Sequence, residues 1–392
     1  MPLGFIVDSN SKVLGSKHTT SVPNIISKYE YINNLIGQKL VFLILPHSFL
    51  GCELYINFIS SDSIPLFLSK DIGYESFEAI VNSYEPEFII CPEDFKPVNN
   101  EYDFIDNISD LKLYRLGRQK NLSYSDDICV LASTSGSTGS PKLVAQTSDN
   151  ILTNTKQIVK SLDIRNSSIA FLSLPLSYTF GMSVLNCQLY ANANAVISDS
   201  SLISKETLEL ILESNVTLLP GVPATFEQLL AFRFFSSKYA THIKILIQAG
   251  GNMREDIWLN LSQICDKAHA ELFVMYGQAE ATTRISSFSY TKNKDKLGSA
   301  GKVMEGGKLV IASKDNDSGI NEGEIIYFGG NVCPKYVLNA TDLMDLTDQK
   351  KMGLKTGDIG YLDADGFLFI TGRKKRFAKM KGVSFNLDEL DK

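Results

Sequence analysis

Apolar runs of strand length alternate with amphipathic helical segments over most of the chain before residue 295. The strands expected from these runs lie at 39–45, 64–67, 87–91, 128–132, 168–174, 195–198, 216–219, 243–248 and 271–275. The helices expected between them lie at 48–59, 74–83, 148–162, 182–190, 205–213 and 254–267 and after Pro223. This alternation is typical of βαβ units, in which helices cover both faces of a parallel sheet. The sequence therefore predicts an α/β fold with more than one parallel sheet.

A different pattern begins near residue 295, where glycines interrupt short β-rich pieces. Asp365-Gly366 is typical of a hairpin turn between strands at 359–362 and 367–370. The polar stretch 99–125 is expected to be a connection with local structure and without chemistry. We therefore expect α/β subdomains that bind nucleotide and acyl group over 1–294, a smaller β-rich, barrel-like subdomain over 295–371, and a hinge segment over 372–392.

A loop of small residues follows the apolar strand 128–132, with the sequence Ser133-Thr134-Ser135-Gly136-Ser137-Thr138-Gly139-Ser140-Pro141-Lys142. Glycines and hydroxyls allow backbone N–H groups to close around phosphate oxygens, and Lys142 would add a positive charge. A flexible Ser/Gly linker is the alternative, but the apolar strand before the loop and the Pro-Lys pair after it favour an anchored loop. The commoner phosphate loop differs because its Gly-Lys pair is followed by Ser or Thr. We expect a helix to follow this loop, with Ser148 or Asp149 as its N-cap.

Composition and charge exclude several classes of protein. The 392 residues, 44% of them hydrophobic and 21% charged, are ordinary for a globular protein with more than one compact unit. A net charge of -6 gives no reason to expect a nucleic-acid partner. The N-terminus lacks the pattern of a signal peptide, and the apolar run 40–46 is too short to span a membrane. Six cysteines without a Cys-x-x-Cys pair and four histidines without metal spacing indicate a cytoplasmic protein rather than a zinc or disulfide framework.

The loop resembles the signature of the adenylate-forming, AMP-binding enzymes, which include acyl-CoA synthetases, adenylation domains of peptide synthetases and luciferases. Four further stretches extend the resemblance over nearly the whole chain from about residue 35. The resemblance implies ATP and Mg²⁺ as cofactors and a small carboxylic acid as substrate. It also implies activation of that acid as an acyl-adenylate with release of pyrophosphate. The acyl group would then pass to coenzyme A or to the phosphopantetheine of a carrier protein.

Three of the four stretches imply nucleotide contacts. The first, 275–280, is similar to a Tyr-Gly-x-Thr-Glu motif, so Tyr276 would stack on adenine and Glu280 would hold Mg²⁺, whereas Ala279 stands where the family has Thr. The second, 248–252, is similar to a Gly-Gly turn along the adenine. The third joins 356–358 to Arg373, so Asp358 would accept hydrogen bonds from both ribose hydroxyls. The resemblance implies Lys142, Thr138 and Glu280 as catalytic residues, and the nucleotide contacts Thr134, Ser135, Gly136, Ser137, Thr138, Gly139, Lys142, Gly250, Gly251, Asn252, Tyr276, Gly277, Gln278, Ala279, Asp358 and Arg373.

The fourth stretch, 175–181, is similar to the segment that lines the acyl pocket. Tyr178, Phe180 and Gly181 would line this pocket, together with Val222 and Pro223 downstream. Many relatives carry His at the position of Tyr178, and peptide-synthetase domains place an Asp in this segment to hold an α-amine. The absence of that Asp disfavours an ordinary α-amino acid. An amino-acid adenylation domain and an inactive nucleotide-binding relative remain the alternatives.

The basic run 373–376 has two interpretations. One is a nucleic-acid or targeting patch. The other, which the resemblance favours, is the hinge between the large domain and a C-terminal lid, with Lys375 at the hinge position. Two departures from the family pattern lie nearby, Lys335 in place of Gly before Tyr336 and Ser384 in place of Arg. The sequence ends at Lys392, so we expect a missing lid, slow adenylation and inefficient transfer to a thiol.

Overall fold

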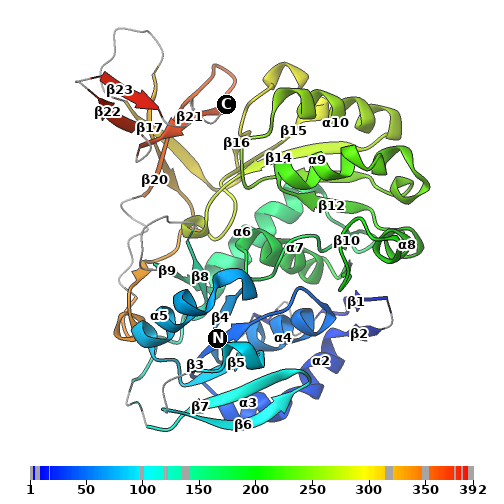
Figure 1. The fold of residues 1–392 in the computed structure, drawn as a ribbon. Helices are drawn as coiled ribbons and strands as arrows, with labels where there is room; N and C mark the ends of the chain where they lie inside the picture. The colour runs from blue at the N-terminus through cyan, green and yellow to red at the C-terminus, as the bar shows by residue number, and fades with distance from the viewer. Residues whose placement is uncertain are drawn as a thin grey trace.

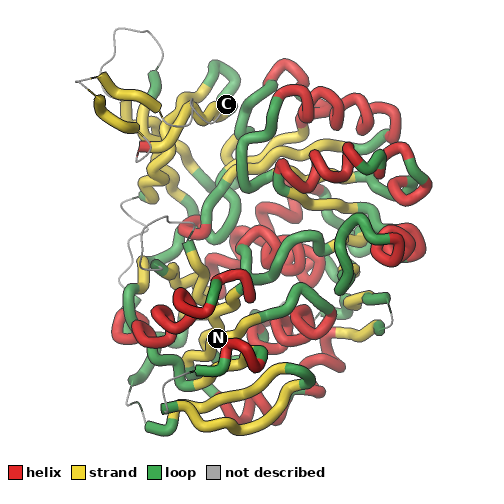
Figure 2. The backbone as a smooth tube through the Cα atoms, in the orientation of Figure 1, coloured by secondary structure: helices red, strands yellow, loops and turns green. Residues whose placement is uncertain are grey.

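Two large sheets with a layer of helices between them form most of the computed structural model of this chain (Figure 1). A smaller group of strands adjoins them near the C-terminus, as the yellow strands of Figure 2 show. The structure describes residues 3–4, 9–16, 18–97, 101–118, 120, 122–134, 142–313, 321–346, 353–374, 377–380 and 383–386, and only the backbone of residues 313, 377–380 and 383–386. The multi-sheet α/β fold expected from the sequence is confirmed.

The first large sheet has eight strands in the order β19-β9-β8-β4-β3-β5-β7-β6. Its centre is parallel, because β8, β4, β3 and β5 run in one direction. Neighbours on both sides are antiparallel to this centre. The strands are β3 (Leu40–Ile44), β4 (Ile64–Leu68), β5 (Phe88–Cys91), β6 (Tyr102–Ile108), β7 (Leu111–Leu116), β8 (Ile128–Ser133), β9 (Leu143–Thr147) and β19 (Tyr336–Val337).

The second large sheet has nine strands in the order β16-β15-β14-β13-β12-β10-β11-β1-β2. From β14 to β1 all neighbours are parallel, and antiparallel strands close both edges. The strands are β1 (Lys12–Leu14), β2 (Thr19–Ser21), β10 (Ile169–Phe171), β11 (Asn194–Val196), β12 (Leu218–Gly221), β13 (Ile245–Gln248), β14 (Glu271–Tyr276), β15 (Ser286–Ser289) and β16 (Lys302–Val303).

Two of the helices between the sheets, α4 (Phe49–Ile59) and α7 (Thr179–Tyr190), are the most apolar of the described helices. In α4 every residue from Gly51 onward is buried, and in α7 every residue up to Leu189 is buried. A helix that is apolar on all sides is stable only when it is covered on all sides. Together with α6 (Ser148–Leu162) these helices form the core that joins the two sheets.

Amphipathic helices cover the outer faces of both sheets. The eight-stranded sheet carries α5 (Tyr74–Tyr84) on its outer face. The nine-stranded sheet carries α8 (Lys205–Glu213), α9 (Pro223–Ala231) and α10 (Glu255–Ala268). Two short helices near the N-terminus, α2 (Val22–Lys28) and α3 (Glu30–Ile36), complete the helical layers. None of the helices in the described part of the chain combines the length and apolar character needed to cross a bilayer.

The β-rich C-terminal region expected from the sequence contains a four-stranded antiparallel sheet in the order β17-β18-β20-β21. Its strands are β17 (Lys308–Ser313), β18 (Gly323–Phe328), β20 (Leu354–Leu362) and β21 (Leu368–Arg373), followed by the hairpin β22 (Phe377–Met380) and β23 (Val383–Asn386). Two strands of the range 295–371, β16 and β19, belong to the large sheets instead. The subdomain boundaries at 294 and 371 stay a prediction.

Two local expectations are wrong. A strand, β9, follows the small-residue loop and pairs with β8, so the loop joins two antiparallel strands rather than a strand and a helix. The helix α6 spans the expected residues, but its N-cap is Thr147 rather than Ser148 or Asp149, and Thr147 forms a capping box with Asn150. The polar stretch 99–125, expected to be a connection with local structure, contains the hairpin of β6 and β7.

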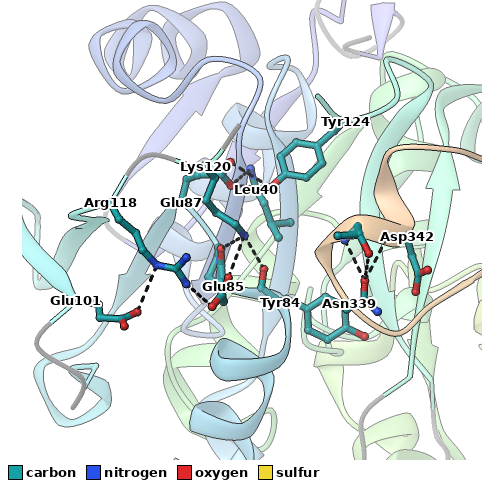
Figure 3. A network of polar contacts seen from close by, with 12 residues as sticks. Leu40, Tyr84, Glu85, Glu87, Glu101, Arg118, Lys120, Tyr124, Asn339 and Asp342 are labelled. Atoms are coloured by element: carbon teal, nitrogen blue, oxygen red, sulfur yellow. Dashed lines mark hydrogen bonds and ion pairs between the residues drawn. The ribbon is translucent and has the colours of Figure 1, made fainter. Parts of the chain in front are cut away.

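A network of polar contacts attaches β19 to the eight-stranded sheet (Figure 3). The Tyr84 hydroxyl at the end of α5 donates to the carbonyl of Val337 at 2.7 Å. The Lys120 ammonium holds the carbonyl of Tyr84 at 3.1 Å. Asn339, directly after β19, caps the next turn by accepting from two backbone N–H groups. The short strand β19 is therefore fixed from both sides.

Asn150 joins α6 to the segment before β19, which gives a test of this architecture. Its Oδ1 accepts from the Thr147 N–H at 3.0 Å, and its Nδ2 donates to the carbonyls of Gly330 and Val332 at 2.8 and 3.0 Å. We predict that Asn150→Ala lowers the free energy of unfolding by about 2–3 kcal/mol, because it leaves buried backbone groups unpaired. Urea denaturation measures this value. Asn107→Ala, at an exposed position of β6, is the control and should change stability by less than about 0.5 kcal/mol.

Candidate functional site

The ends of three adjacent parallel strands bring the predicted site residues together. Gly221 at the end of β12 lies opposite Gln248 at the end of β13, and β14 ends beside them. The turns after these strands carry Val222 and Pro223, residues 249–252, and residues 277–280 respectively. The carboxyl edge of a parallel sheet is where open α/β folds bind ligands, because the strand-to-helix turns open there.

Acyl-pocket and nucleotide residues meet at Gly250. Its φ of +82° is in the left-handed region, and a Cβ there would lie 2.8 Å from the Tyr178 hydroxyl and 3.1 Å from Val222 Cγ1. Only glycine fits this position without strain. Gln248 Nε2 donates to the carbonyl of Gly251 at 2.8 Å and holds the turn. The adenine turn and the acyl pocket that the resemblance implies are thus neighbours, with Asn252 exposed at the rim.

Asp358 is held between two donors from different parts of the chain. The Tyr276 hydroxyl donates to its Oδ2 at 2.5 Å, and Arg373 Nε donates to its Oδ1 at 2.7 Å. Asp358 is 3% exposed, whereas the Arg373 side chain is 53% exposed. Asp358 and Arg373 face each other across β20 and β21, while Tyr276 ends β14 of the nine-stranded sheet. The structure therefore brings together three residues that the sequence analysis assigned to adenine and ribose.

Electrostatics raise the pKa of both donors, so the Tyr276 hydroxyl stays protonated and the Arg373 guanidinium stays charged. Burial, and then the neighbouring Asp358 carboxylate, raise the pKa of the Tyr276 hydroxyl well above its usual value. Burial lowers the pKa of Arg373, but the attraction of Asp358 outweighs this effect and the net pKa is raised. A carboxylate has about four lone-pair sites. Each Asp358 oxygen therefore keeps acceptor capacity for a hydroxyl group of a ligand.

Glu280 is oriented by a residue that the sequence analysis did not use. The Tyr336 hydroxyl donates to Glu280 Oε1 at 2.9 Å, and the Glu280 carbonyl accepts from the Cys333 N–H at 2.8 Å. Burial and then the Glu280 charge raise the pKa of Tyr336 above its usual value. Lys335 departs from the Gly-Tyr pair of the family, but Tyr336 matches the second residue of that pair and was the available signal in the sequence.

The ends of the small-residue loop, predicted to bind phosphate, are adjacent to this carboxylate-bearing segment. Thr134 donates through its backbone N and its Oγ1 to the carbonyl of Lys142, at 3.3 and 3.0 Å. Leu143, the next residue, lies opposite Val337 in the pairing of β9 with β19. Lys142 is exposed. The predicted loop residues Ser135, Gly136, Ser137, Thr138 and Gly139 and the hinge residue Lys375 lie outside the described residues.

Two motif positions have structural roles. A Cβ on Gly277 would lie 2.0 Å from the Thr283 carbonyl, so glycine is required for the chain to fold back after β14. Ala279 packs with Ala132, Val144 and Cys333 in an apolar cluster, and its carbonyl accepts from Gln146 Nε2 at 3.3 Å. Gln278 precedes this turn without a side-chain cap. The methyl group at position 279 therefore has an apolar environment that suits it.

The N-cap and first turn of α7 carry three of the residues predicted to line the acyl pocket. Tyr178 is the N-cap of this helix and is 40% exposed, whereas Phe180 is buried, with 6.3 Å between the two ring centroids. A Cβ on Gly181 would lie 2.2 Å from the Pro175 carbonyl, so the helix start can pack this closely only with glycine. The guanidinium of Arg284, which the sequence analysis missed, lies 3.9 Å from the Phe180 ring centroid.

The sequence profile of the AMP-binding enzyme family matches residues 62–337. This chain belongs to the AMP-binding enzyme family. A 2-succinylbenzoate–CoA ligase of Geobacillus sp. (strain WCH70) is 28% identical over 254 residues, which are 64% of this chain and 49% of that protein. 4-Coumarate-CoA ligase 1 of Narcissus pseudonarcissus is 28% identical over 279 residues, 68% of this chain and 50% of that protein. This family member thus spans about half the length of these two curated relatives.

Solved structures of the family share the fold. O-succinylbenzoate coenzyme A synthetase from Bacillus subtilis in complex with AMP superposes with a TM-score of 0.79 at 19% identity, over 99% of this chain and 82% of that chain. The same enzyme with ATP and magnesium gives a TM-score of 0.75 at 20% identity, over 98% and 82% of the two chains.

The hydrogen bond between Tyr276 and Asp358 yields a prediction about stability. Tyr276→Phe removes one of the two donors from a carboxylate that is 3% exposed. We expect the free energy of unfolding to fall by about 1–3 kcal/mol, because a hydrogen bond to a charged buried group is lost. Guanidinium denaturation monitored by circular dichroism measures this loss. Tyr361→Phe is the matched control, since Tyr361 stacks on Phe369 in the same small sheet. Equal stability of Tyr276→Phe and the parent would contradict the role assigned to this bond.

Proposed function

We propose that this chain provides the nucleotide- and acyl-binding part of an ATP-dependent ligase that activates a carboxylic acid. The acid becomes an acyl-adenylate with release of pyrophosphate, and its acyl group passes to a thiol, either coenzyme A or the phosphopantetheine of a carrier protein. The observation that carries the proposal is the Tyr276–Asp358–Arg373 cluster at the carboxyl edge of the nine-stranded sheet. The names of its relatives, ligases that join carboxylic acids to coenzyme A, support the same reaction class.

The cluster suits a ribose. Asp358 is an acceptor with its position fixed by two donors, and a vicinal diol supplies two hydroxyl donors to such a carboxylate. Arg373, half exposed, can reach a phosphate while it remains paired with Asp358. Tyr276 ends β14, and the glycine turn at 250–251 follows the neighbouring strand β13, so an adenine could lie between an aromatic face and a bare backbone.

The residues present also fit Mg²⁺ bound together with a nucleotide. Within the described residues no cluster of three or more metal-ligating side chains occurs. Mg²⁺ in nucleotide enzymes is commonly held by one or two carboxylates plus substrate phosphates, so the single carboxylate of Glu280 suffices. When bound, Mg²⁺ would neutralise negative charge on the phosphate oxygens. Tyr336 orients Glu280 for this contact through its hydroxyl.

The reaction brings two anions together, so positioning and neutralisation account for most of its acceleration. Lys142 and the small-residue loop would bind the leaving phosphates. Asp358 would fix the ribose, and Tyr178, Val222 and Gly250 would place the acid beside the α-phosphorus. The carboxylate oxygen then forms a bond to the α-phosphorus while the bond to pyrophosphate breaks.

Ligand-dependent thermal stability of the 392-residue chain tests the proposal. Binding to the folded state alone raises the apparent melting temperature in proportion to RT ln(1 + [L]/Kd). We expect Mg-ATP and AMP to raise it, and a carboxylic acid of the correct class to raise it further. Acid-dependent exchange of pyrophosphate into ATP then tests the chemistry. Stabilisation by nucleotide without any acid-dependent effect would favour an inactive nucleotide-binding relative, and no response to nucleotide would overturn the proposal.

Asp358→Ala tests the ribose contact. We predict that the variant binds AMP about 10–150-fold more weakly, because a charge-assisted hydrogen bond contributes about 1.5–3 kcal/mol. Isothermal titration calorimetry measures the affinity. Asp110→Ala, in an exposed turn between β6 and β7, controls for the loss of one negative charge. Unchanged AMP affinity in Asp358→Ala would contradict this assignment.

Tyr336→Phe tests the metal side of the site separately. The variant keeps the aromatic ring and loses only the hydroxyl that donates to Glu280. We expect Mg-ATP to bind about 3–10-fold more weakly, since one hydrogen bond of about 1 kcal/mol orients the carboxylate. Binding of AMP without magnesium should stay within twofold of the parent. If both ligands lose affinity equally, Tyr336 acts on the whole site rather than on Glu280.

A further inference from the structure

A small cavity lies directly behind the candidate site, between the nine-stranded sheet and the helices α6 and α7. Leu218, Ile247 and Met275 form its floor, one from each of the three strands whose ends carry the site. Met275 immediately precedes Tyr276, and Ile247 lies three residues before Gly250. Phe180 separates the cavity from Tyr178 at the surface. An acyl group that enters beside Tyr178 and Gly250 therefore points toward this cavity.

Arg284 places a positive charge at the wall of this mostly apolar cavity, which Ser183 and Gln188 also line. Its residue is 4% exposed, and its Nε has no hydrogen-bond partner among the described residues. Nη1 lies 3.5 Å from the carbonyl of Thr283, and no carboxylate of the described chain forms an ion pair with the guanidinium. Burial lowers the pKa of Arg284 to about 10, so the group remains charged at neutral pH. An unpaired cation in such a position is unfavourable for folding.

The backbone of Arg284 is fixed in a way that keeps the side chain in the cavity. Asn154 of α6 accepts from the Arg284 N–H at 3.0 Å and donates to its carbonyl at 2.9 Å. Asn331 donates to the same carbonyl at 2.9 Å. The guanidinium lies on the Phe180 ring, which supports its orientation by a cation–π contact. The Arg284 backbone is therefore held in place, whereas its guanidinium has no ion-pair partner among the described residues.

Gln188 adds a second unpaired polar group to the same cavity. It is 0% exposed, and neither its Nε2 nor its Oε1 has a hydrogen-bond partner among the described residues. It lies two helical turns beyond Phe180 on the face of α7 that lines the cavity. Cys187, its neighbour on that face, lies close enough to Arg284 to feel its charge. Buried polar groups are rarely left unpaired, and such exceptions are concentrated at functional sites.

We infer that Arg284 and Gln188 form a subsite for a carboxylate at the far end of the acyl substrate, so that the acid activated here is a dicarboxylic acid. One carboxylate would lie at the nucleotide, and the other would pair with the guanidinium of Arg284 and accept a hydrogen bond from Gln188 Nε2. The inference rests on the proposed function for the first carboxylate. A ligand carboxylate supplies the counter-charge that the described chain does not. The ammonium group of an amino acid would be repelled by the same guanidinium, and the small cavity favours a short acid.

The test compares acids that differ only at the far end. Butanoate, pentanoate and hexanoate are paired with butanedioate, pentanedioate and hexanedioate, and binding to the 392-residue chain is measured by calorimetry with and without Mg-ATP. We expect at least one dicarboxylate to bind ten- to 150-fold tighter than its partner, the range given by a charge-assisted hydrogen bond. In Arg284→Met the two acids of a pair should bind with affinities within twofold of each other. Gln188→Leu should lower the preference for the dicarboxylate by a factor of three to ten. Arg284→Lys keeps a positive charge and should retain part of the preference. Arg165→Met, at an exposed arginine, is the matched control.

A stability measurement separates binding from packing. Methionine keeps the aliphatic contact with Phe180 and removes an unpaired charge, so the melting temperature of Arg284→Met should equal or exceed that of the parent. A lower melting temperature with an unchanged acid preference would show that the guanidinium serves packing alone and would overturn the inference. So would equal affinity of the parent for both members of every pair, or no binding of either. A preference for dicarboxylates in a chain that binds no nucleotide would support the subsite and overturn the proposed function instead.

Discussion

A carboxylate that is withdrawn from water needs donors, and this requirement at Asp358 governs the arrangement of the site. One donor, Arg373, comes from the same hairpin, and the other, Tyr276, comes from the end of a strand in a different sheet. The four-stranded sheet must therefore lie against the carboxyl edge of the nine-stranded sheet for Asp358 to be satisfied. The helices α4, α6 and α7 pack behind this edge, in the core that joins the two large sheets. The position of the Asp358 carboxylate thus depends on the four-stranded sheet, the nine-stranded sheet and the helices behind it.

The sequence predicts elements well where one local pattern decides them. The parallel strands such as β3 and β13 are short apolar runs between helical segments, and both were expected within a few residues of their bounds. β9 was not predicted, because its apolar residues directly follow the small-residue loop and the polar composition of that loop masks the strand pattern. The hairpin β6–β7 was missed because its first strand is mostly exposed and reads as polar. Edge strands of this kind are stabilised by their partner rather than by their own pattern.

The sequence predicted those site residues that lie in contiguous motifs. Tyr276, Asp358 and Arg373 lie in such motifs, and the structure brings them into contact. Tyr336 holds Glu280 across 56 positions of sequence, a contact that no local pattern reveals. Arg284 lies four residues after Glu280, between Thr283 and Ile285, where the sequence alone does not distinguish a buried arginine from a solvated one. Only the fold reveals that its side chain turns inward over Phe180.

Because Asp358 and Arg373 are directly opposite each other in β20 and β21, the carboxylate and its cation are parts of a single rigid hairpin. Any rocking of the small sheet moves both together, while Tyr276 stays with the nine-stranded sheet. A ribose held by Asp358 would move with the four-stranded sheet, and an adenine stacked on Tyr276 would stay with the nine-stranded sheet. A bound nucleoside would then link the four-stranded sheet to the nine-stranded sheet, because its glycosidic bond joins the ribose at Asp358 to the adenine at Tyr276.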